Sequence, residues 1–228
     1  MNNNKYLKLK TIQNKNSCHF IENEIRDTLI NIIILKKSNI NISNLFPYNI
    51  NLTVSVVSNK KEDIPKYYNE YITDNYENTI NTILNNNLSK YLMIITDNYS
   101  FENNFIELLY HELNKINSNI LLLFNDNQIN KFNINIKFLY KINEPFLCIF
   151  NNNIKKKFNY NSSEIGIFLY INELLYEYEL IESSTSIKFT LNNNQLNETI
   201  KLFDIYINQI EEITFNKNIF YEFVDLLS

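Results

Sequence analysis

The chain has 228 residues, of which 45% are hydrophobic and 14% aromatic, and this content is too high for a disordered protein. Its 21 basic and 25 acidic residues give a net charge of −4, which argues against a protein that binds nucleic acid mainly by neutralising phosphates. The length suits one domain with a large core, so we expect a polar arm over residues 1–17 and a single domain over residues 18–228.

Cysteine usage and hydropathy indicate the compartment. Cys18 and Cys148 are too few for a disulfide framework, which favours a reducing environment. No apolar run reaches the length of about 18 residues that a membrane helix needs, and the N-terminus lacks the apolar core of a signal peptide. We therefore expect a soluble, cytoplasmic protein that does not contact membranes.

The first part of the chain is expected to form a helix, a strand and a second helix. Apolar residues recur every three or four positions over residues 18–36, which predicts an amphipathic helix. Alternation over residues 50–56 predicts a strand with one buried face. Pro65 suits the first turn of a helix that continues to Leu84, with a break near Thr73.

The middle of the chain predicts two fully buried strands with a helix between them. The apolar run Tyr91–Thr96, which Asp97 ends, is typical of a strand buried on both faces of a parallel sheet. Ser100 can cap a helix over residues 101–113, and residues 120–124 form a second apolar run. Strand, helix and strand in so short a span indicate a βαβ unit with parallel pairing and a right-handed crossover.

The last third is expected to contain a hairpin, a further helix and a closing strand. Alternating residues 134–140 and the apolar run 146–150 predict the antiparallel hairpin. Asn161 and Glu164 suit the start of a helix that contains Gly166. The remaining expected elements are a strand over residues 187–191 and two helices over residues 196–213 and 219–227.

Gly166 is the only glycine in the chain, and this excludes several nucleotide sites. Dinucleotide folds and P-loops place glycines after the first strand so that the backbone can approach phosphate without a Cβ clash. We therefore expect an α/β fold with a mixed sheet flanked by helices, lacking the Gly-rich cofactor loop.

Few residues have a pattern that indicates chemistry. Asp97 is the main candidate, because open α/β sheets bind ligands at the carboxyl ends of their strands; an aspartate that only forms a turn is the alternative. The pairs Cys18–His19 and His111–Glu112 lack the spacing of a zinc site, so ordinary packing is the favoured interpretation. We expect no catalytic, cofactor-binding or metal-binding residues.

Several segments together carry a resemblance to a known family. They are the strand 91–96 with its turn Asp97-Asn98-Tyr99, the helix and strand 101–124, the hairpin 134–150 with Lys155 to Lys157, and residues 186–193. In these segments the chain, from about Asn49 to its end, resembles the small, non-catalytic subunit of the poxvirus mRNA-capping enzyme.

The resemblance implies a methyltransferase-like (Rossmann-like) sheet that has lost its catalytic and cofactor apparatus. Active cap ribose methyltransferases of this architecture pair an aspartate with a lysine on the next strand. Asp97 matches the aspartate, whereas Phe124 and Asn125 stand where the lysine belongs, so Asp97 is interpreted as part of a vestigial site.

The implied function is regulatory rather than enzymatic. The chain is expected to form a heterodimer with the large catalytic subunit of an mRNA-capping enzyme and to stimulate its guanine-N7 methyltransferase domain allosterically. This function needs no cofactor, allows indirect RNA contact, and implies the host cytoplasm and the virion as locations.

Two other classes of function stay open. The absence of Ala and the abundance of Asn, Ile and Lys indicate A+T-rich codons, and the chain could be an immunity or antitoxin-like protein from a mobile element. The other alternative is a nuclease or methyltransferase that uses Asp97 and His111.

Overall fold

The structure is a computed structural model, and it describes residues 19–21, 28–38, 40–42, 45–115, 118–124, 146–160, 162, 164–178, 181–184 and 187–191. Five of the predictions lie outside these residues: the arm 1–17, the hairpin strand 134–140, the cap residue Asn161, and the two C-terminal helices over 196–213 and 219–227.

The described residues form one eight-stranded sheet and a two-stranded ribbon. The sheet has the order β1-β4-β3-β2-β5-β8-β7-β9, and the ribbon pairs β10 with β6. The strands are β1 (His19–Ile21), β2 (Ile30–Leu35), β3 (Leu52–Ser58), β4 (Asn69–Ile72), β5 (Tyr91–Thr96), β6 (Tyr99–Phe101), β7 (Ile120–Phe124), β8 (Phe146–Asn151), β9 (Ile181–Ser184) and β10 (Phe189–Leu191).

The sheet is mixed. Four neighbouring strands, β4, β3, β2 and β5, pair in parallel. β8 is antiparallel to both of its neighbours, β5 and β7, while β9 is parallel to β7 and β1 is antiparallel to β4. All strands of this sheet except β1 and β8 therefore point the same way, and their carboxyl ends share one edge.

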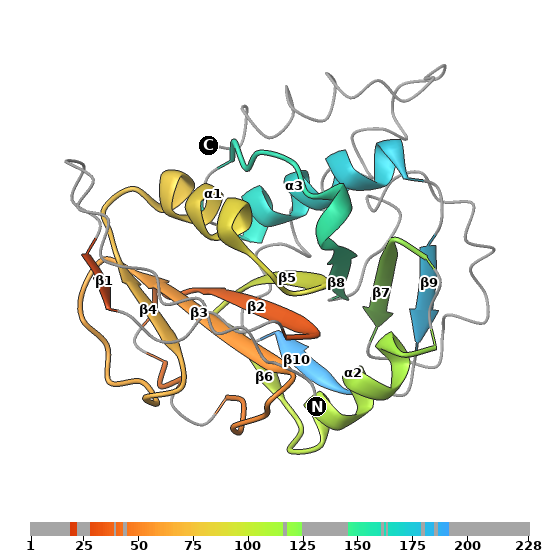
Figure 1. Ribbon diagram of the computed structural model, residues 1–228, viewed down its shortest axis with the longest axis horizontal. Coiled ribbons are helices and arrows are strands. Elements are labelled where there is room, and N and C mark those ends of the chain that lie inside the picture. Colours follow the sequence, from red (N-terminus) through yellow and green to blue (C-terminus); the bar gives the residue numbers. More distant parts are fainter. Residues whose placement is uncertain are drawn as a thin grey trace, which may run out of the picture.

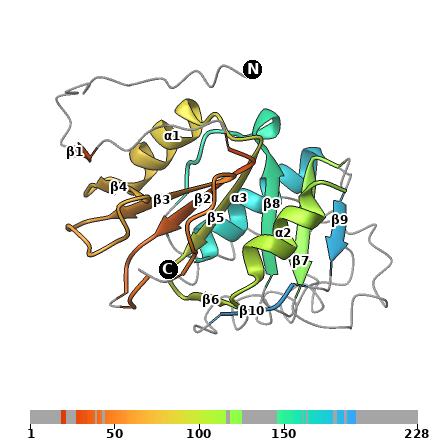
Figure 2. The same ribbon diagram turned by 60° about the horizontal axis from the view of Figure 1, so that its bottom comes forward.

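Helices cover both faces of the sheet. Helices α1 (Tyr76–Asn86) and α3 (Glu164–Glu177) lie on one face, and α2 (Phe105–Leu113) lies on the other face beside the β6–β10 ribbon (Figures 1 and 2). Successive side chains of a strand point to opposite faces. In β5 the side chain of Leu92 joins the cluster under α1 and α3, while that of Met93 joins the cluster under α2.

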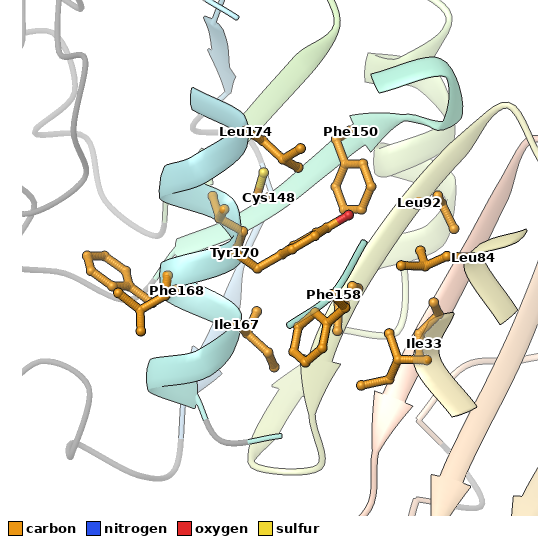
Figure 3. Close-up of a cluster of buried hydrophobic side chains, with 14 of the residues drawn as sticks. Ile33, Leu84, Leu92, Cys148, Phe150, Phe158, Ile167, Phe168, Tyr170 and Leu174 are labelled. Atoms are coloured by element: carbon orange, nitrogen blue, oxygen red, sulfur yellow. The ribbon is translucent and has the colours of Figure 1, made fainter. Parts of the chain in front are cut away.

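An aromatic cluster fills the space between α3 and the sheet. The Tyr170 ring lies between Phe150 and Phe158, with ring centroids 5.8 and 5.3 Å away, and Leu174 packs in the same cluster (Figure 3). The Tyr170 hydroxyl donates to the Lys156 carbonyl oxygen at 3.2 Å, so its polar atom has a partner within the core. Burial raises the pKa of this phenol, which stays protonated and keeps donating.

The predicted helix over residues 18–36 is wrong, because residues 30–35 form β2. Its spacing of apolar residues suited a helix, but every residue from Ile30 to Leu35 is buried, and a run rich in isoleucine is better placed between two covering layers. Pro65 does not start a helix either: its carbonyl accepts the Tyr68 amide in a turn that leads into β4.

The predicted βαβ unit is correct in its elements and wrong in its pairing. The strands at residues 91–96 and 120–124 and the helix between them are present, but β8 lies between β5 and β7. The helix starts later than predicted, and Ser100 does not cap it; Ser100 belongs to β6, and Asn104 occupies the cap position. An antiparallel strand inserted from later in the chain leaves no local signal in residues 91–124.

Other predicted elements are confirmed. β3, β5 and β7 lie where alternation or continuous burial placed them, and α3 matches the predicted helix. β8 has the residues of the second hairpin strand, but its two neighbours in the sheet are β5 and β7. The predicted break near Thr73 is also present, with β4 before it and α1 after it.

No helix in the described part of the chain is long and apolar enough to cross a membrane.

The packing of α3 gives the first prediction. We expect Leu174→Ala to lower the free energy of unfolding by about 2–5 kcal/mol, because the Leu174 side chain is fully buried and its removal leaves a cavity. Leu88→Ala is the matched control: Leu88 is 45% exposed, so we expect a change within about 0.5 kcal/mol. Urea denaturation measures both, and equal effects would contradict the described core.

Candidate functional site

The strand order identifies one place on the sheet edge as the candidate site. From β2 the chain continues to β3 and β4 on one side, and then returns to β5 on the other side of β2. In open α/β sheets, ligands bind outside the carboxyl ends of the strands where the strand order reverses in this way. That point lies between the carboxyl ends of β2 and β5.

A buried ion pair occupies this point. Lys36 directly follows β2, and Asp97 directly follows β5. The Lys36 Nζ lies 3.1 Å from Asp97 Oδ2, and the two residues are only 4% and 1% exposed. Burying a single charge to this degree costs free energy unless an opposite charge lies beside it. Each side chain therefore compensates for the lost hydration of the other.

Asp97 accepts three further hydrogen bonds from the turn after β2. Its Oδ2 accepts the Ser38 amide at 2.9 Å and the Ser38 hydroxyl at 2.6 Å, and its Oδ1 accepts the Lys37 amide at 3.3 Å. The Lys36 ammonium also donates to the Ser38 carbonyl oxygen. One carboxylate therefore fixes the conformation of the whole turn 36–38, and Asp97 acts as a positioning residue.

Tyr76 supports the same turn from α1. Its hydroxyl donates to the Lys36 carbonyl oxygen at 2.8 Å, and the Lys37 ammonium lies 5.3 Å from the centre of its ring. Burial raises the pKa of the Tyr76 phenol, and the nearby Asp97 carboxylate raises it further. The phenol therefore stays protonated and remains a donor to the turn.

Exposed lysines gather around this edge. Leu35 pairs with Val57, so the turn after β2 and the turn after β3 leave the sheet side by side. Lys37 belongs to the first turn, and Lys60 and Lys61 belong to the second; all three are exposed. The edge thus presents ammonium groups to solvent beside the buried pair, together with the carboxylates of Glu62 and Asp74, which lie near enough to raise the pKa of Tyr76.

A pocket of about 420 Å³ opens on the α2 face beyond this edge. Three connections form it: residues 45–48 between β2 and β3, Tyr67 between β3 and β4, and residues 101–106 from β6 into α2. Tyr99 stacks on Phe101, whose ring centroid lies 4.9 Å from that of Phe46, so aromatic contacts connect the Asp97 turn to the pocket wall.

The other residues singled out by sequence lie elsewhere. His111 is 67% exposed near the end of α2, and its Nδ1 lies 3.7 Å from Glu112 Oε1, so the structure does not join it to Asp97. Cys148 is buried in β8, where burial raises the pKa of its thiol. Within the described residues, no three His, Cys, Asp or Glu side chains gather closely enough to hold a metal ion.

The lysine triplet at 155–157 follows β8 at the opposite edge of the sheet. The Asn152 amide donates to the Lys90 carbonyl just before β5, which places this segment near the amino ends of the parallel strands. Lys156 pairs with Glu173 at 3.3 Å and with Glu177 at 2.5 Å. The triplet therefore does not contribute to the site at the β2–β5 switch point.

The sequence analysis found Asp97 and missed Lys36. The wrong helix over residues 18–36 hid the fact that Lys36 follows a buried strand, as Asp97 does. A signal was present, because a run of β-branched residues ended by two lysines is typical of a buried strand that leaves the sheet at a polar edge. Tyr48 and Tyr67 had no such signal.

Comparisons with known proteins identify the fold. No family model matches the chain, and no curated protein matches it. Among solved structures, S. aureus TarS has a TM-score of 0.55 at 9% identity over 86% of this chain and 42% of TarS. TarS 1-349 has a TM-score of 0.51 at 9% identity over 85% of this chain and 68% of that one, and its complex with UDP has 0.53 at 8% identity, over 85% and 69%.

These matches confirm a mixed, Rossmann-like α/β sheet flanked by helices, and none of these structures is a methyltransferase or a capping-enzyme subunit. The prediction that the chain is not an enzyme is contradicted, because TarS is a catalytic glycosyltransferase. The physical reason is that a missing Gly-rich loop excludes one way of holding phosphate, and it does not exclude catalysis on this fold.

The ion pair gives the second prediction. We expect Asp97→Ala to lower the free energy of unfolding by about 3–5 kcal/mol, because it leaves the buried Lys36 ammonium without its counter-charge. Glu112→Ala is the control, since Glu112 pairs with Lys115, which is 55% exposed, and such pairs contribute about 0–1 kcal/mol. Denaturant unfolding of both variants checks this, and an Asp97 effect no larger than the control would contradict it.

Proposed function

We propose that this protein is an enzyme that binds a nucleoside diphosphate sugar at the β2–β5 switch point and transfers the sugar to an acceptor. The observation that supports it most is the arrangement of that edge: a turn fixed by Asp97, with exposed lysines on two neighbouring turns. The likeness to TarS, one structure of which is a complex with UDP, supports the choice of ligand.

Exposed lysine side chains are the groups of the edge that can hold a diphosphate. Lysine ammonium groups bind phosphate as point charges, and Lys37, Lys60 and Lys61 are exposed to do so. The amides of Lys37 and Ser38 already donate to Asp97, so the backbone of this turn is used for positioning. We therefore assign the phosphate contact to lysine side chains rather than to a backbone cradle, which agrees with the absence of a Gly-rich loop.

The chemistry of transfer follows from this arrangement. The acceptor hydroxyl oxygen forms a bond to the anomeric carbon as the bond from that carbon to the diphosphate oxygen breaks, and the hydroxyl proton passes to water. The electron pair of the broken bond leaves with the diphosphate, and cationic side chains near that charge stabilise it in the transition state. Lys37 is held against the Tyr76 ring, so part of its orientation is set before the ligand binds. We therefore assign residues 36–38 one role: they form a rigid turn that holds the Lys37 ammonium near the leaving diphosphate.

The capping-enzyme partnership and the methyltransferase-like version of the fold stay predictions. The contacts at this edge of the sheet do not favour a heterodimer with a large catalytic subunit, and they do not favour the immunity-protein alternative. Stimulation of a cap guanine-N7 methyltransferase by the purified chain, without any effect of UDP, would favour the first of these over sugar transfer.

Charge reversal at the edge gives the third prediction. We expect UDP to bind the purified chain, and Lys37→Glu and Lys60→Glu each to weaken the binding by roughly tenfold, about 1.4 kcal/mol, because each replaces an attraction to phosphate with a repulsion. Isothermal titration calorimetry measures the affinity, and release of sugar or UDP from UDP-sugars measures the activity.

Lys157→Glu is the matched control for this test. Lys157 is also exposed and the change in net charge is the same, but the residue lies at the opposite edge of the sheet. Equal weakening in all three variants would indicate a general charge effect. No binding of UDP or UDP-sugars by the unmodified chain would remove the proposed function.

A further inference from the structure

The pocket on the α2 face is separate from the buried ion pair and has its own chemistry. Half of its described lining residues are aromatic, and the charged and amide side chains of the lining are Glu102 and Asn103. The aromatic residues are Phe46, Tyr48, Tyr67, Phe101 and Phe105. Most ligand pockets are lined mainly by apolar groups, whereas more of the exposed lining of this pocket is polar than apolar. Such a lining suits a ligand that carries several hydrogen-bonding groups.

Two of the rings are exposed to solvent and yet held in place. Tyr48 is 56% exposed and Tyr67 is 40% exposed, and their rings meet edge to face at 5.5 Å. The Tyr67 hydroxyl donates to the Phe46 carbonyl oxygen at 3.2 Å, and its ring also packs edge to face on Tyr68 at 5.1 Å. A ring fixed before binding loses little conformational entropy when a ligand stacks on it.

The polar residues of the pocket decide which ligand class suits it. The described lining residues include the Glu102 carboxylate and no lysine or arginine, so a phosphate-bearing ligand meets a like charge. A carboxylate accepts hydrogen bonds from hydroxyl groups, and the Asn103 amide can both donate and accept. Aromatic rings with these two groups suit a neutral ring that has an apolar face and several hydroxyls.

We infer that this pocket binds a neutral saccharide, with Tyr48 and Tyr67 as stacking surfaces and Glu102 and Asn103 as hydroxyl partners. The pocket lies close to the switch point: Phe101 is four positions after Asp97 in the chain, so their Cα atoms are at most about 15 Å apart. The inference deepens the proposed function by naming the acceptor class. The role as acceptor site rests on that function, whereas saccharide binding itself does not.

The test uses the full chain and a panel of neutral monosaccharides: the methyl glycosides of glucose, galactose and mannose, and N-acetylglucosamine. We expect at least one to bind in the millimolar range, as measured by saturation-transfer NMR on the saccharide. In amide correlation spectra of the protein, we expect the same saccharide to shift the amides of residues 45–48, 67 and 101–106. We expect Tyr67→Ala to weaken that binding at least about fivefold, because it removes a stacking ring.

Tyr110→Ala is the matched control, because Tyr110 is also 40% exposed and lies on α2 outside the pocket lining. It should leave saccharide binding unchanged. Tyr67→Phe keeps the ring and should retain most of the affinity. If Tyr67→Ala does not fold, Tyr48→Ala removes the other exposed ring and carries the same expectation.

The inference would be overturned if no saccharide of the panel binds at tens of millimolar, or if Tyr110→Ala weakens binding as much as Tyr67→Ala. Shifts caused by UDP in the pocket amides, and not at residues 36–38, would also overturn it, because the pocket would then hold the anionic ligand. UDP titrated into the same samples separates the two proposals. If a saccharide binds and UDP does not, the inference about the pocket holds and the proposed sugar-transfer function is wrong.

Discussion

The carboxylate of Asp97 is the group on which the geometry of the candidate site depends. It lies at the end of β5 and holds the turn that follows β2 through one ammonium, one hydroxyl and two amide donors. Because the pair with Lys36 is almost fully buried, neither residue is free to reach a ligand. Its effect is indirect: it fixes the turn from which Lys37 reaches solvent, and it starts the segment that continues through Tyr99 and Phe101 to the aromatic pocket.

Two kinds of surface thus lie near one edge of the sheet. The lysines after β2 and β3 suit an anionic ligand, whereas the pocket with Tyr67 and Glu102 suits a neutral, hydroxyl-bearing ring. A transferase that moves a sugar from a diphosphate to an acceptor needs both kinds of surface, close enough for the acceptor hydroxyl to reach the anomeric carbon. In the proposed transfer, the like charge of Glu102 disfavours a phosphate in the pocket.

Much of the fold could be predicted from the sequence, because burial on two faces leaves a local pattern. The continuous runs in β5 and β7 and the alternation in β3 gave correct strands, and Asp97 was placed correctly at a carboxyl end. The helical spacing of apolar residues gave a wrong helix at β2, because its isoleucines also fit one face of a helix. The insertion of β8 between β5 and β7, and the meeting of Tyr67 with Tyr48, depend on long-range contacts that no local pattern records.

Amide chemical-shift mapping with UDP tests the central claim most directly, because it reports where on the sheet a nucleoside diphosphate binds. The account predicts that the shifts concentrate in residues 36–38, 59–62 and 97–99, at the carboxyl ends of β2, β3 and β5. Shifts confined to residues 87–90 and 152–157, at the opposite edge, or no shifts at saturating UDP, would contradict it.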